Sequence, residues 1–328
     1  MSSNKDCIIF GLKNCEGIAK NISKNTKIPL GKWHSINFAD GEFLFTSDNV
    51  VRGKHVFLIQ STSKPVNNTI MELLIAVDTI KRSSSKKITV VMPYYGYSRQ
   101  DRKTKGREPI TSRLVADLYQ VAGVDRILTI DIHSPQQQGF FSIPFDSLTA
   151  IWLLFDNFRK NKKINNCVIV SPDYGGVKRV QSVAEEIGVG FAIVDKRRSK
   201  PNEVEVSDIL GDVKGKDCII IDDMIDTAGT ICASAQLLKK HDAKSVSILA
   251  SHGLFNGEAI KKLSELNKNG VIEQIIITNT INHDSLPKFI KIVDISKMLS
   301  DAVDIFAKEQ GSLSNVYHKY KYFKDFNS

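Results

Sequence analysis

Short apolar runs rich in β-branched residues recur along the chain and alternate with segments of helical periodicity. The runs are apolar on both faces, which is typical of strands covered by helices on each side. This alternation predicts βαβ units and a mostly parallel sheet. The predicted strands are 6–10, 56–60, 88–92, 126–130, 167–170, 191–194, 218–221, 245–250 and 274–277. The predicted helices are 67–82, 110–121, 175–187 and 229–241.

The series of strands and helices runs twice, so we expect two similar α/β domains. The 328 residues are enough for roughly two domains. The stretch 140–166, with Pro144 and a helix-like segment at 148–158, marks the join. We therefore expect an N-terminal domain at 1–146, a C-terminal domain at 147–303, and a tail at 304–328 that packs on the N-terminal domain.

Composition excludes several classes of protein. Hydrophobic residues are 42% and charged residues 25%, as in an ordinary globular protein. No charge-free apolar run approaches the roughly 20 residues that span a bilayer. The five cysteines are odd in number and never spaced as C-x-x-C, so we expect free buried thiols and a cytoplasmic location. The net charge of +9 indicates anionic partners, which could be nucleic acid, lipid or small phosphates.

The segment 218–230 carries the sharpest chemical signal. An apolar strand ends in Asp222 and Asp223, and a turn at 226–230 then opens a helix. A helix N-terminus suits a phosphate, and Gly229 lets the backbone approach it closely. The two carboxylates would repel that phosphate, so we expect them to face sugar hydroxyls or a metal ion. The alternative is a Thr-capped helix beside surface aspartates.

This segment resembles the phosphoribosyl-diphosphate binding loop of type I phosphoribosyltransferase-fold proteins. Further matches occur in order along the chain, and together they resemble the ribose-phosphate pyrophosphokinase family. The resemblance implies an α/β protein with two similar domains of the type I phosphoribosyltransferase fold, each with a mainly parallel sheet flanked by helices. The matching segments are 38–42, 93–102, 131–134 with 138–141, 171–179 and 195–198.

The resemblance implies diphosphoryl transfer from ATP to ribose 5-phosphate, giving 5-phosphoribosyl 1-diphosphate and AMP for nucleotide biosynthesis. Arginine side chains form bidentate contacts with phosphate oxygens, and a glutamine can satisfy a base edge. The residues implied to bind ATP are Phe38, Asp40, Gly41, Glu42, Arg99, Gln100 and Arg102.

The same resemblance implies Mg2+ as cofactor. Asp131 and His133 follow a predicted strand on the same side of the chain. Taken alone, a histidine there is more often a structural residue. The family implies His133 and Asp173 as magnesium ligands, with Asp131 beside them. Ser142 stands where many members have Asp, which leaves an auxiliary metal contact open.

Four cations lie within residues 196–200. Their alternatives are a solvated loop or a nucleic-acid patch. The resemblance implies a mobile loop over the reacting diphosphate, with Lys196 and Arg198 as catalytic cations. It also implies contacts to ribose 5-phosphate from Arg198, Asp222, Asp223, Asp226, Thr227, Ala228, Gly229 and Thr230. Ala228 stands where the family usually has Gly, so its methyl must point away from the phosphate.

Regulation is implied by the resemblance as well. The family's common class forms homohexamers that are activated by phosphate and inhibited by ADP. Each matching residue alone reads as a surface cation or hydroxyl. The residues that resemble this regulatory phosphate site are Arg52, Ser84, Ser312 and Ser314.

Three other functions are alternatives to the pyrophosphokinase reaction. A non-catalytic regulatory subunit of the same fold would have an interrupted catalytic loop, whereas 195–198 and 222–230 are continuous. A phosphoribosyltransferase that consumes the product would not need the segments at 38–42 and 99–102. A nucleic-acid-binding module would explain the charge, but no aromatic-basic array is present. We therefore expect no nucleic acid and no membrane among the partners.

Overall fold

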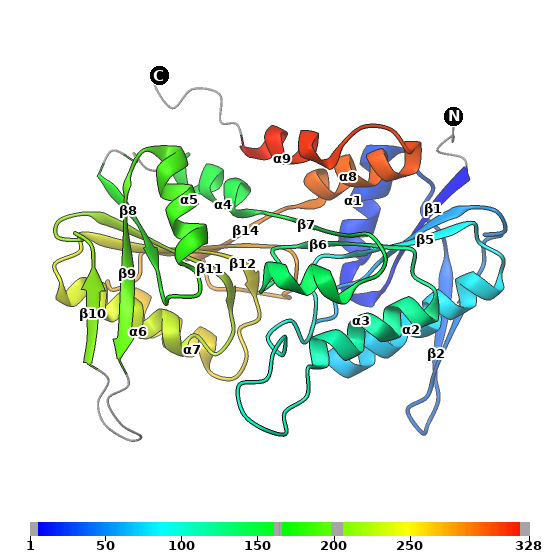
Figure 1. Ribbon diagram of the computed structural model, residues 1–328, viewed down its shortest axis with the longest axis horizontal. Coiled ribbons are helices and arrows are strands. Elements are labelled where there is room, and N and C mark those ends of the chain that lie inside the picture. The colour runs from blue at the N-terminus through cyan, green and yellow to red at the C-terminus, as the bar shows by residue number, and fades with distance from the viewer. Residues whose placement is uncertain (1–5, 161–163, 165, 198–205, 322–328) are drawn as a thin grey trace. The chain divides into compact units, whose positions relative to one another are not determined.

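The computed structural model describes residues 6–160, 164, 166–197 and 206–321 (Figure 1). Contacts divide the chain into two compact units. Unit 1 holds the described residues of 1–150, 280–282 and 294–322, and unit 2 holds those of 151–279 and 283–293. Contact-based units need not coincide with family domains, so the domain limits expected from the sequence stay a prediction.

Unit 1 is built on a five-stranded parallel sheet in the order β1-β4-β5-β6-β7. Every residue of β4 is buried, as the apolar run at this position predicts. The strands are β1 (Cys7–Gly11), β4 (His55–Ile59), β5 (Lys87–Met92), β6 (Arg126–Ile130) and β7 (Phe145–Leu148). A separate antiparallel hairpin joins β2 (Trp33–Asn37) to β3 (Phe43–Ser47).

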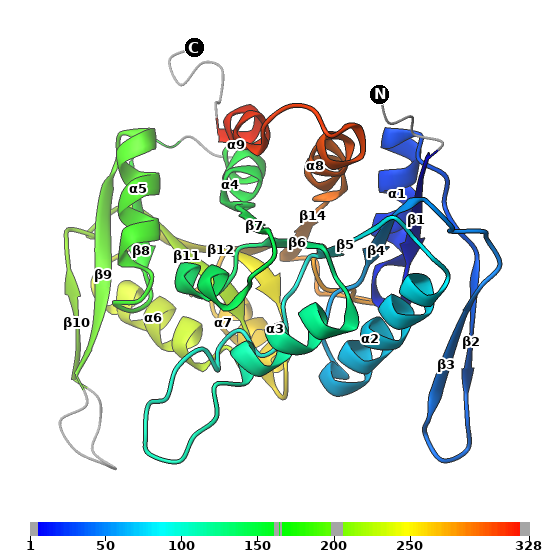
Figure 2. The same cartoon turned by 45° about the vertical axis from the view of Figure 1, so that its right-hand side comes forward.

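Helices cover both faces of the unit 1 sheet. Helices α2 (Val66–Arg82) and α3 (Thr111–Ala122) lie on one face, while α1 (Glu16–Thr26) and α8 (Ser296–Lys308) lie on the other (Figures 1 and 2). Helix α9 (Leu313–Lys321) packs against α8. Two short 3-10 helices, η2 (Lys13–Cys15) and η3 (Pro135–Phe140), follow β1 and β6.

Unit 2 is built on a seven-stranded sheet in the order β10-β9-β8-β11-β12-β13-β14. All pairs are parallel except β10 with β9. The strands are β8 (Cys167–Ser171), β9 (Gly190–Arg197), β10 (Val206–Leu210), β11 (Asp217–Ile225), β12 (Ser245–Gly253), β13 (Gln274–Thr278) and β14 (Ile290–Val293). The predicted mostly parallel sheets flanked by helices are confirmed.

Helices also cover both faces of the unit 2 sheet. Helices α4 (Ile151–Arg159) and α5 (Val177–Ile187) lie on one face, and α6 (Gly229–Lys240) and α7 (Ala259–Lys268) on the other (Figure 1). The expected helix at 148–158 was wrong in its start, because Leu148 pairs with Ile130 at the end of β7.

Strand β11 shows why this sheet needs two helical layers. Cys218 and Ile220 belong to one hydrophobic cluster, whereas Ile219 and Ile221 belong to another. Alternate residues therefore face opposite cores, and both faces must be covered. Both faces of β11 are packed against a hydrophobic cluster, so the strand holds the residues at its carboxyl end in place.

All five cysteines are free thiols, four of them buried and Cys232 half-buried, as expected. Burial raises the pKa of the Cys15 thiol to about 11. Over the described part of the chain, no helix is both long and apolar enough to cross a membrane.

The double coverage of β11 predicts the outcome of a matched pair of substitutions. Ile220→Ala removes a fully buried side chain and should lower the free energy of unfolding by about 2–5 kcal/mol. Ile292→Ala, at a side chain that is 46% exposed on edge strand β14, should cost much less. Equal losses in chemical denaturation would contradict the packing described.

Candidate active site

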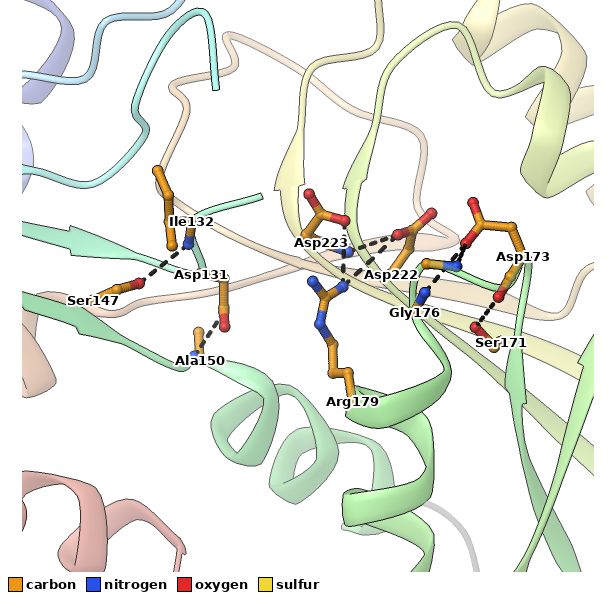
Figure 3. A network of polar contacts seen from close by, with 11 residues as sticks. Asp131, Ile132, Ser147, Ala150, Ser171, Asp173, Gly176, Arg179, Asp222 and Asp223 are labelled. Carbon is orange, nitrogen blue, oxygen red and sulfur yellow. Dashed lines mark hydrogen bonds and ion pairs between the residues drawn. The ribbon is translucent and has the colours of Figure 1, made fainter. Parts of the chain in front are cut away.

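Two adjacent aspartates stand near the carboxyl end of β11 in unit 2. Asp223 is 6% exposed, and Asp222 is half-buried. Arg179 of α5 reaches both, with its Nη1 3.3 Å from Asp223 Oδ1 and 3.8 Å from Asp222 Oδ1 (Figure 3). The backbone N–H of Asp223 also donates to Asp222 Oδ1 at 2.9 Å. One arginine thus orients a pair of carboxylates.

The charge on this pair is only partly balanced. Burial raises the pKa of Asp222 well above its usual value, and the neighbouring carboxyl of Asp223 raises it further. The Arg179 guanidinium opposes both effects. A bound cation or hydroxyl donors would stabilise the ionised carboxylates. The arrangement therefore suits a polyhydroxylated ligand or a divalent ion.

The turn after β11 leads directly into α6. Asp226 accepts a hydrogen bond from the Asn256 amide at 2.7 Å, so its carboxylate helps to hold the turn. Ala228 adopts φ 61° and is 4% exposed within a hydrophobic cluster of unit 2. Its methyl is therefore buried in the core and does not line the exposed surface of the turn.

The N-terminus of α6 is an available anion site. The N-cap residue, Ala228, supplies no side-chain hydrogen bond, and the first turn holds no acidic residue. Thr227, Gly229 and Thr230 are exposed, and a Cβ added at Gly229 would meet nothing within 4 Å. The first N–H groups of a helix lack partners within it and carry its positive dipole end. A phosphate can approach this backbone closely.

Asp173 lies in the loop between β8 and α5. Its Oδ1 accepts the N–H groups of Gly175 at 2.9 Å and Gly176 at 3.2 Å (Figure 3). A Cβ added at Gly176 would lie 2.7 Å from Ser171 Oγ, so glycine is required for this close turn. One carboxylate oxygen of Asp173 thus shapes the loop.

Asp131 follows β6 in unit 1. It adopts φ 35°, and its Oδ2 accepts the N–H of Ala150 at 2.8 Å. Ser147 Oγ accepts the next N–H, that of Ile132, at 3.1 Å (Figure 3). These bonds join the loop after β6 to β7, and His133 is exposed beyond them.

The donors available to a metal ion are mainly carboxylates. Within the described ranges, no group of three or more His, Cys, Asp or Glu side chains gathers around one point. Mg2+ prefers oxygen ligands and keeps several waters, so it needs only one or two protein carboxylates together with phosphate oxygens. The underbalanced pair of Asp222 and Asp223 fits such an ion.

The segment 38–42 forms the tip of the β2–β3 hairpin in unit 1. The Phe38 side chain is 46% exposed, and Asp40 Oδ1 accepts the N–H of Glu42 at 3.0 Å to close the turn. Gly41, with φ 92°, provides the backbone conformation that the turn requires. Gly41 and Glu42 line a pocket of about 940 Å3 between the hairpin and α2.

The loop between β5 and α3 presents the other residues expected to bind ATP. Arg99, Gln100 and Arg102 are exposed. Thr111 Oγ1 donates to Gln100 Oε1 at 2.6 Å. These three residues are not among the described residues that line the pocket beside Glu42. The structure thus places the two expected ATP-binding segments on separate elements of unit 1.

One of the two expected catalytic cations, Lys196, belongs to β9. The backbone of Lys196 pairs with that of Ser207 in β10. Arg198 lies outside the described residues. The sequence predicted a loop at Lys196, whereas in the structure this residue lies in β9, one residue before the strand ends at Arg197.

Comparisons with known proteins decide the family. Residues 7–123 match the N-terminal domain of ribose phosphate pyrophosphokinase, and residues 148–285 match the phosphoribosyl transferase domain. A ribose-phosphate pyrophosphokinase of Ureaplasma parvum is 49% identical over 318 residues, covering 97% of this chain and 96% of the relative. The chain belongs to the ribose-phosphate pyrophosphokinase family.

Two other members of the family are also similar to this chain. The Mycoplasma pneumoniae ribose-phosphate pyrophosphokinase is 43% identical over 316 residues, which is 95% of this chain and 96% of that one. The crystal structure of phosphoribosylpyrophosphate synthetase from Mycobacterium smegmatis superimposes with a TM-score of 0.87 at 36% identity, covering 93% of this chain and 100% of that chain. The fold expected from the resemblance, with two phosphoribosyltransferase-type domains, is confirmed.

The residues that resemble the family's regulatory phosphate site fall on two parts of unit 1. Arg52 Nη1 donates to Ser84 Oγ at 3.1 Å. Ser312 and Ser314 flank the start of α9, where the Ser314 N–H donates to Ser312 Oγ at 3.2 Å. The backbone N–H of Ser142 donates a hydrogen bond to Gln120 Oε1 at 2.6 Å.

The sequence analysis missed two residues of the candidate site. Arg179 was part of the matched segment 171–179, but its role depends on an ion pair with residues more than 40 positions away. Asn256 holds Asp226 from the loop after β12. One signal for Arg179 was available in the sequence. It is a basic residue in the first turn of the helix that follows Gly175 and Gly176.

The raised pKa of Asp222 predicts a pH-dependent stability. The folded state keeps a proton above pH 3.8, where the unfolded state loses it, so stability falls as pH rises through this window. Asp222→Asn removes the titration and should be more stable than the parent at pH 7, with a difference that vanishes below pH 3.8. The measurement is chemical denaturation across pH without Mg2+ or sugar, with the exposed Asp242→Asn as control. A variant less stable at pH 7 would refute the unbalanced charge.

Proposed function

We propose that this chain transfers the β,γ-diphosphoryl group of ATP to the 1-hydroxyl of ribose 5-phosphate, giving 5-phosphoribosyl 1-diphosphate and AMP. Membership of the ribose-phosphate pyrophosphokinase family supports this reaction. The observation in the molecule that carries it is the acidic pair of β11 beside the open N-terminus of α6. A sugar phosphate has hydroxyl donors for the first and an anion for the second.

In this proposal the ligand is held by opposite charges at its two ends. The ribose hydroxyls donate to Asp222 and Asp223, which Arg179 keeps oriented. The 5-phosphate sits against the backbone N–H groups at the start of α6, with hydroxyls of Thr227 and Thr230 as further donors. The buried methyl of Ala228 leaves this approach open.

The transfer moves one diphosphoryl group as a unit. The 1-hydroxyl oxygen forms a bond to the β-phosphorus and releases its proton to solvent. The bond from the β-phosphorus to the oxygen it shares with the α-phosphorus breaks, and AMP leaves with that electron pair. Since charge spreads over phosphate oxygens, fixed cations supply most of the stabilisation, and we assign this role to Lys196 and Arg198.

Mg2+, when bound, neutralises phosphate oxygens of ATP and of the transferred group. In unit 2, Asp173 and Asp222 would supply carboxylate ligands. In unit 1, His133 would supply an imidazole ligand, and Asp131 supports the loop that carries it. In unit 1, Arg99 and Arg102 bind ATP phosphates, Gln100 contacts the base, and the hairpin tip with Phe38, Asp40, Gly41 and Glu42 completes the nucleotide site.

We also propose a cytoplasmic homohexamer that is activated by phosphate and inhibited by ADP. The contact between Arg52 and Ser84 supports an anion site at this turn, because it holds a guanidinium beside a hydroxyl at the surface. The serines at the start of α9, Ser312 and Ser314, add hydroxyl donors on the same unit.

The reaction is tested by incubating the purified full chain with ATP and Mg2+, with and without ribose 5-phosphate. AMP should form only when the sugar is present. A non-catalytic regulatory subunit would form no AMP in either case. A phosphoribosyltransferase would consume 5-phosphoribosyl 1-diphosphate and release diphosphate when given a nucleobase.

The role of Lys196 predicts a selective kinetic defect. Lys196→Ala should lower kcat by about 10²–10³ with little change in the KM for ribose 5-phosphate, since the cation acts mainly in the transition state. Lys214→Ala is the matched control, because Lys214 is an exposed lysine of the same unit whose Nζ lies 3.8 Å from Asp242 Oδ2. Near-normal kcat in Lys196→Ala would show that the assignment is wrong.

The regulatory site predicts a change in ADP sensitivity. Arg52→Ala removes charged hydrogen bonds to a bound phosphate group and should raise the ADP concentration for half-inhibition by about tenfold or more. Arg82→Ala is the control, since this exposed arginine pairs with Asp78 on α2. Unaltered inhibition in Arg52→Ala would remove Arg52 from the site.

A further inference from the structure

A buried glutamine joins two loops of unit 1. Gln137 lies in η3 and is 1% exposed. Its Nε2 donates to the carbonyl of Ser98 at 2.7 Å, and its Oε1 accepts from Ser112 Oγ at 2.7 Å. Both ends of a buried amide are therefore used, and each bond crosses to a different element.

Ser112 extends this network from the first turn of α3. It is fully buried, and its N–H donates to the carbonyl of Gln100 at 3.1 Å. Its own carbonyl accepts the hydroxyl of Tyr95 at 2.9 Å. The backbone of Gln100 is thus tied to the same serine whose hydroxyl is held by Gln137.

The network stands directly beneath the residues proposed to bind ATP. Ser98 is 3% exposed, whereas Arg99 and Gln100, the next two residues, are exposed. Gln137 holds the buried side of this turn through the Ser98 carbonyl, and Ser112 holds its far side through Gln100. The side chains that face solvent therefore project from a backbone fixed from below.

The other end of the connection leads to the loop after β6. Gln137 lies four residues beyond His133 on the same β6–β7 connection, and its N–H donates to the carbonyl of Ser134 at 3.0 Å. The loop that carries Asp131 and His133 and the loop that carries Arg99 and Gln100 thus share one buried contact.

We propose that Gln137 is a positioning residue for ATP, which sets the register between the Arg99–Gln100 turn and the loop of Asp131 and His133 through its paired contacts to Ser98 and Ser112. The inference rests on the proposed function, because it takes these two loops to bind ATP and its metal ion. Gln137 itself is buried and acts through the turn it holds.

The test is Gln137→Leu in the full chain. Leucine has a similar volume but leaves the Ser98 carbonyl and the Ser112 hydroxyl without their partner. We expect the KM for ATP to rise by about tenfold, the size of effect of losing a buried hydrogen bond. The KM for ribose 5-phosphate should stay within about twofold, because the proposed sugar site belongs to unit 2.

Gln136→Leu is the matched control. Gln136 is the preceding residue, is exposed, and accepts only a local bond from Ser134 Oγ at 2.7 Å in the contacts described. It should leave both KM values unchanged. Thermal unfolding of each variant measures how much folded protein is present.

Two further variants keep the test decisive if Gln137→Leu folds poorly. Ser112→Ala removes only the hydroxyl contact and should raise the KM for ATP by less than Gln137→Leu does. The double variant removes both members of the Gln137–Ser112 hydrogen bond. It leaves only the Ser98 carbonyl without its partner, which costs less stability than leaving the Ser112 hydroxyl unpaired as well. It should raise the KM for ATP no further than Gln137→Leu, because the two side chains act as a unit.

The outcomes separate positioning from a merely structural role. A structural role would lower the melting temperature and the active fraction, and therefore kcat, while both KM values stayed the same. That result, or an equal rise in both KM values, would overturn the inference. If the parent chain formed no AMP, the proposed function would fail by itself. Calorimetric binding of ATP to the parent and to Gln137→Leu would then decide the positioning role, with equal affinities or no binding counting against it.

Discussion

The molecule depends on one electrostatic constraint, the placement of two neighbouring carboxylates at the end of a buried strand. Burial and mutual repulsion raise the pKa of Asp222, and Arg179 offsets these effects only in part. The cost is tolerable because β11 is packed on both faces and holds the pair in place. A ligand that brings hydroxyl donors or a cation would stabilise the ionised carboxylates. Relief of this electrostatic cost would then favour binding.

The rest of unit 2 follows from that position. Helix α6 starts right after the carboxylates, so an anion site lies a few residues from an acidic one. In parallel sheets, ligands bind beyond the carboxyl ends of strands. Residues assigned to the site lie close to the carboxyl ends of β8, β9 and β11. Unit 1 repeats the principle at the ends of β5 and β6, where Gln137 joins the turn proposed to bind ATP to the loop of His133. The residues proposed to bind phosphate account for part of the surplus positive charge.

The sequence predicted the buried strands well, since a strand covered on both faces reads as an unbroken apolar run. It did not predict β2 as a strand, because His34, Ser35 and Asn37 give it no such pattern and most of it is exposed. The carboxylate pair and the turn before α6 were predicted because neighbours in sequence form them. Arg179 and the contact between Gln137 and Ser112 could not be, since they join residues distant in the chain.

In the proposed reaction, the sugar receives a diphosphoryl group intact. The most direct measurement follows ATP labelled in its γ-phosphate, with Mg2+ and ribose 5-phosphate, and identifies the labelled product. If the group moves intact, the label appears in 5-phosphoribosyl 1-diphosphate, with one AMP formed for each labelled sugar. Label in inorganic phosphate or in a ribose bisphosphate, with ADP as the other product, would contradict the proposed reaction.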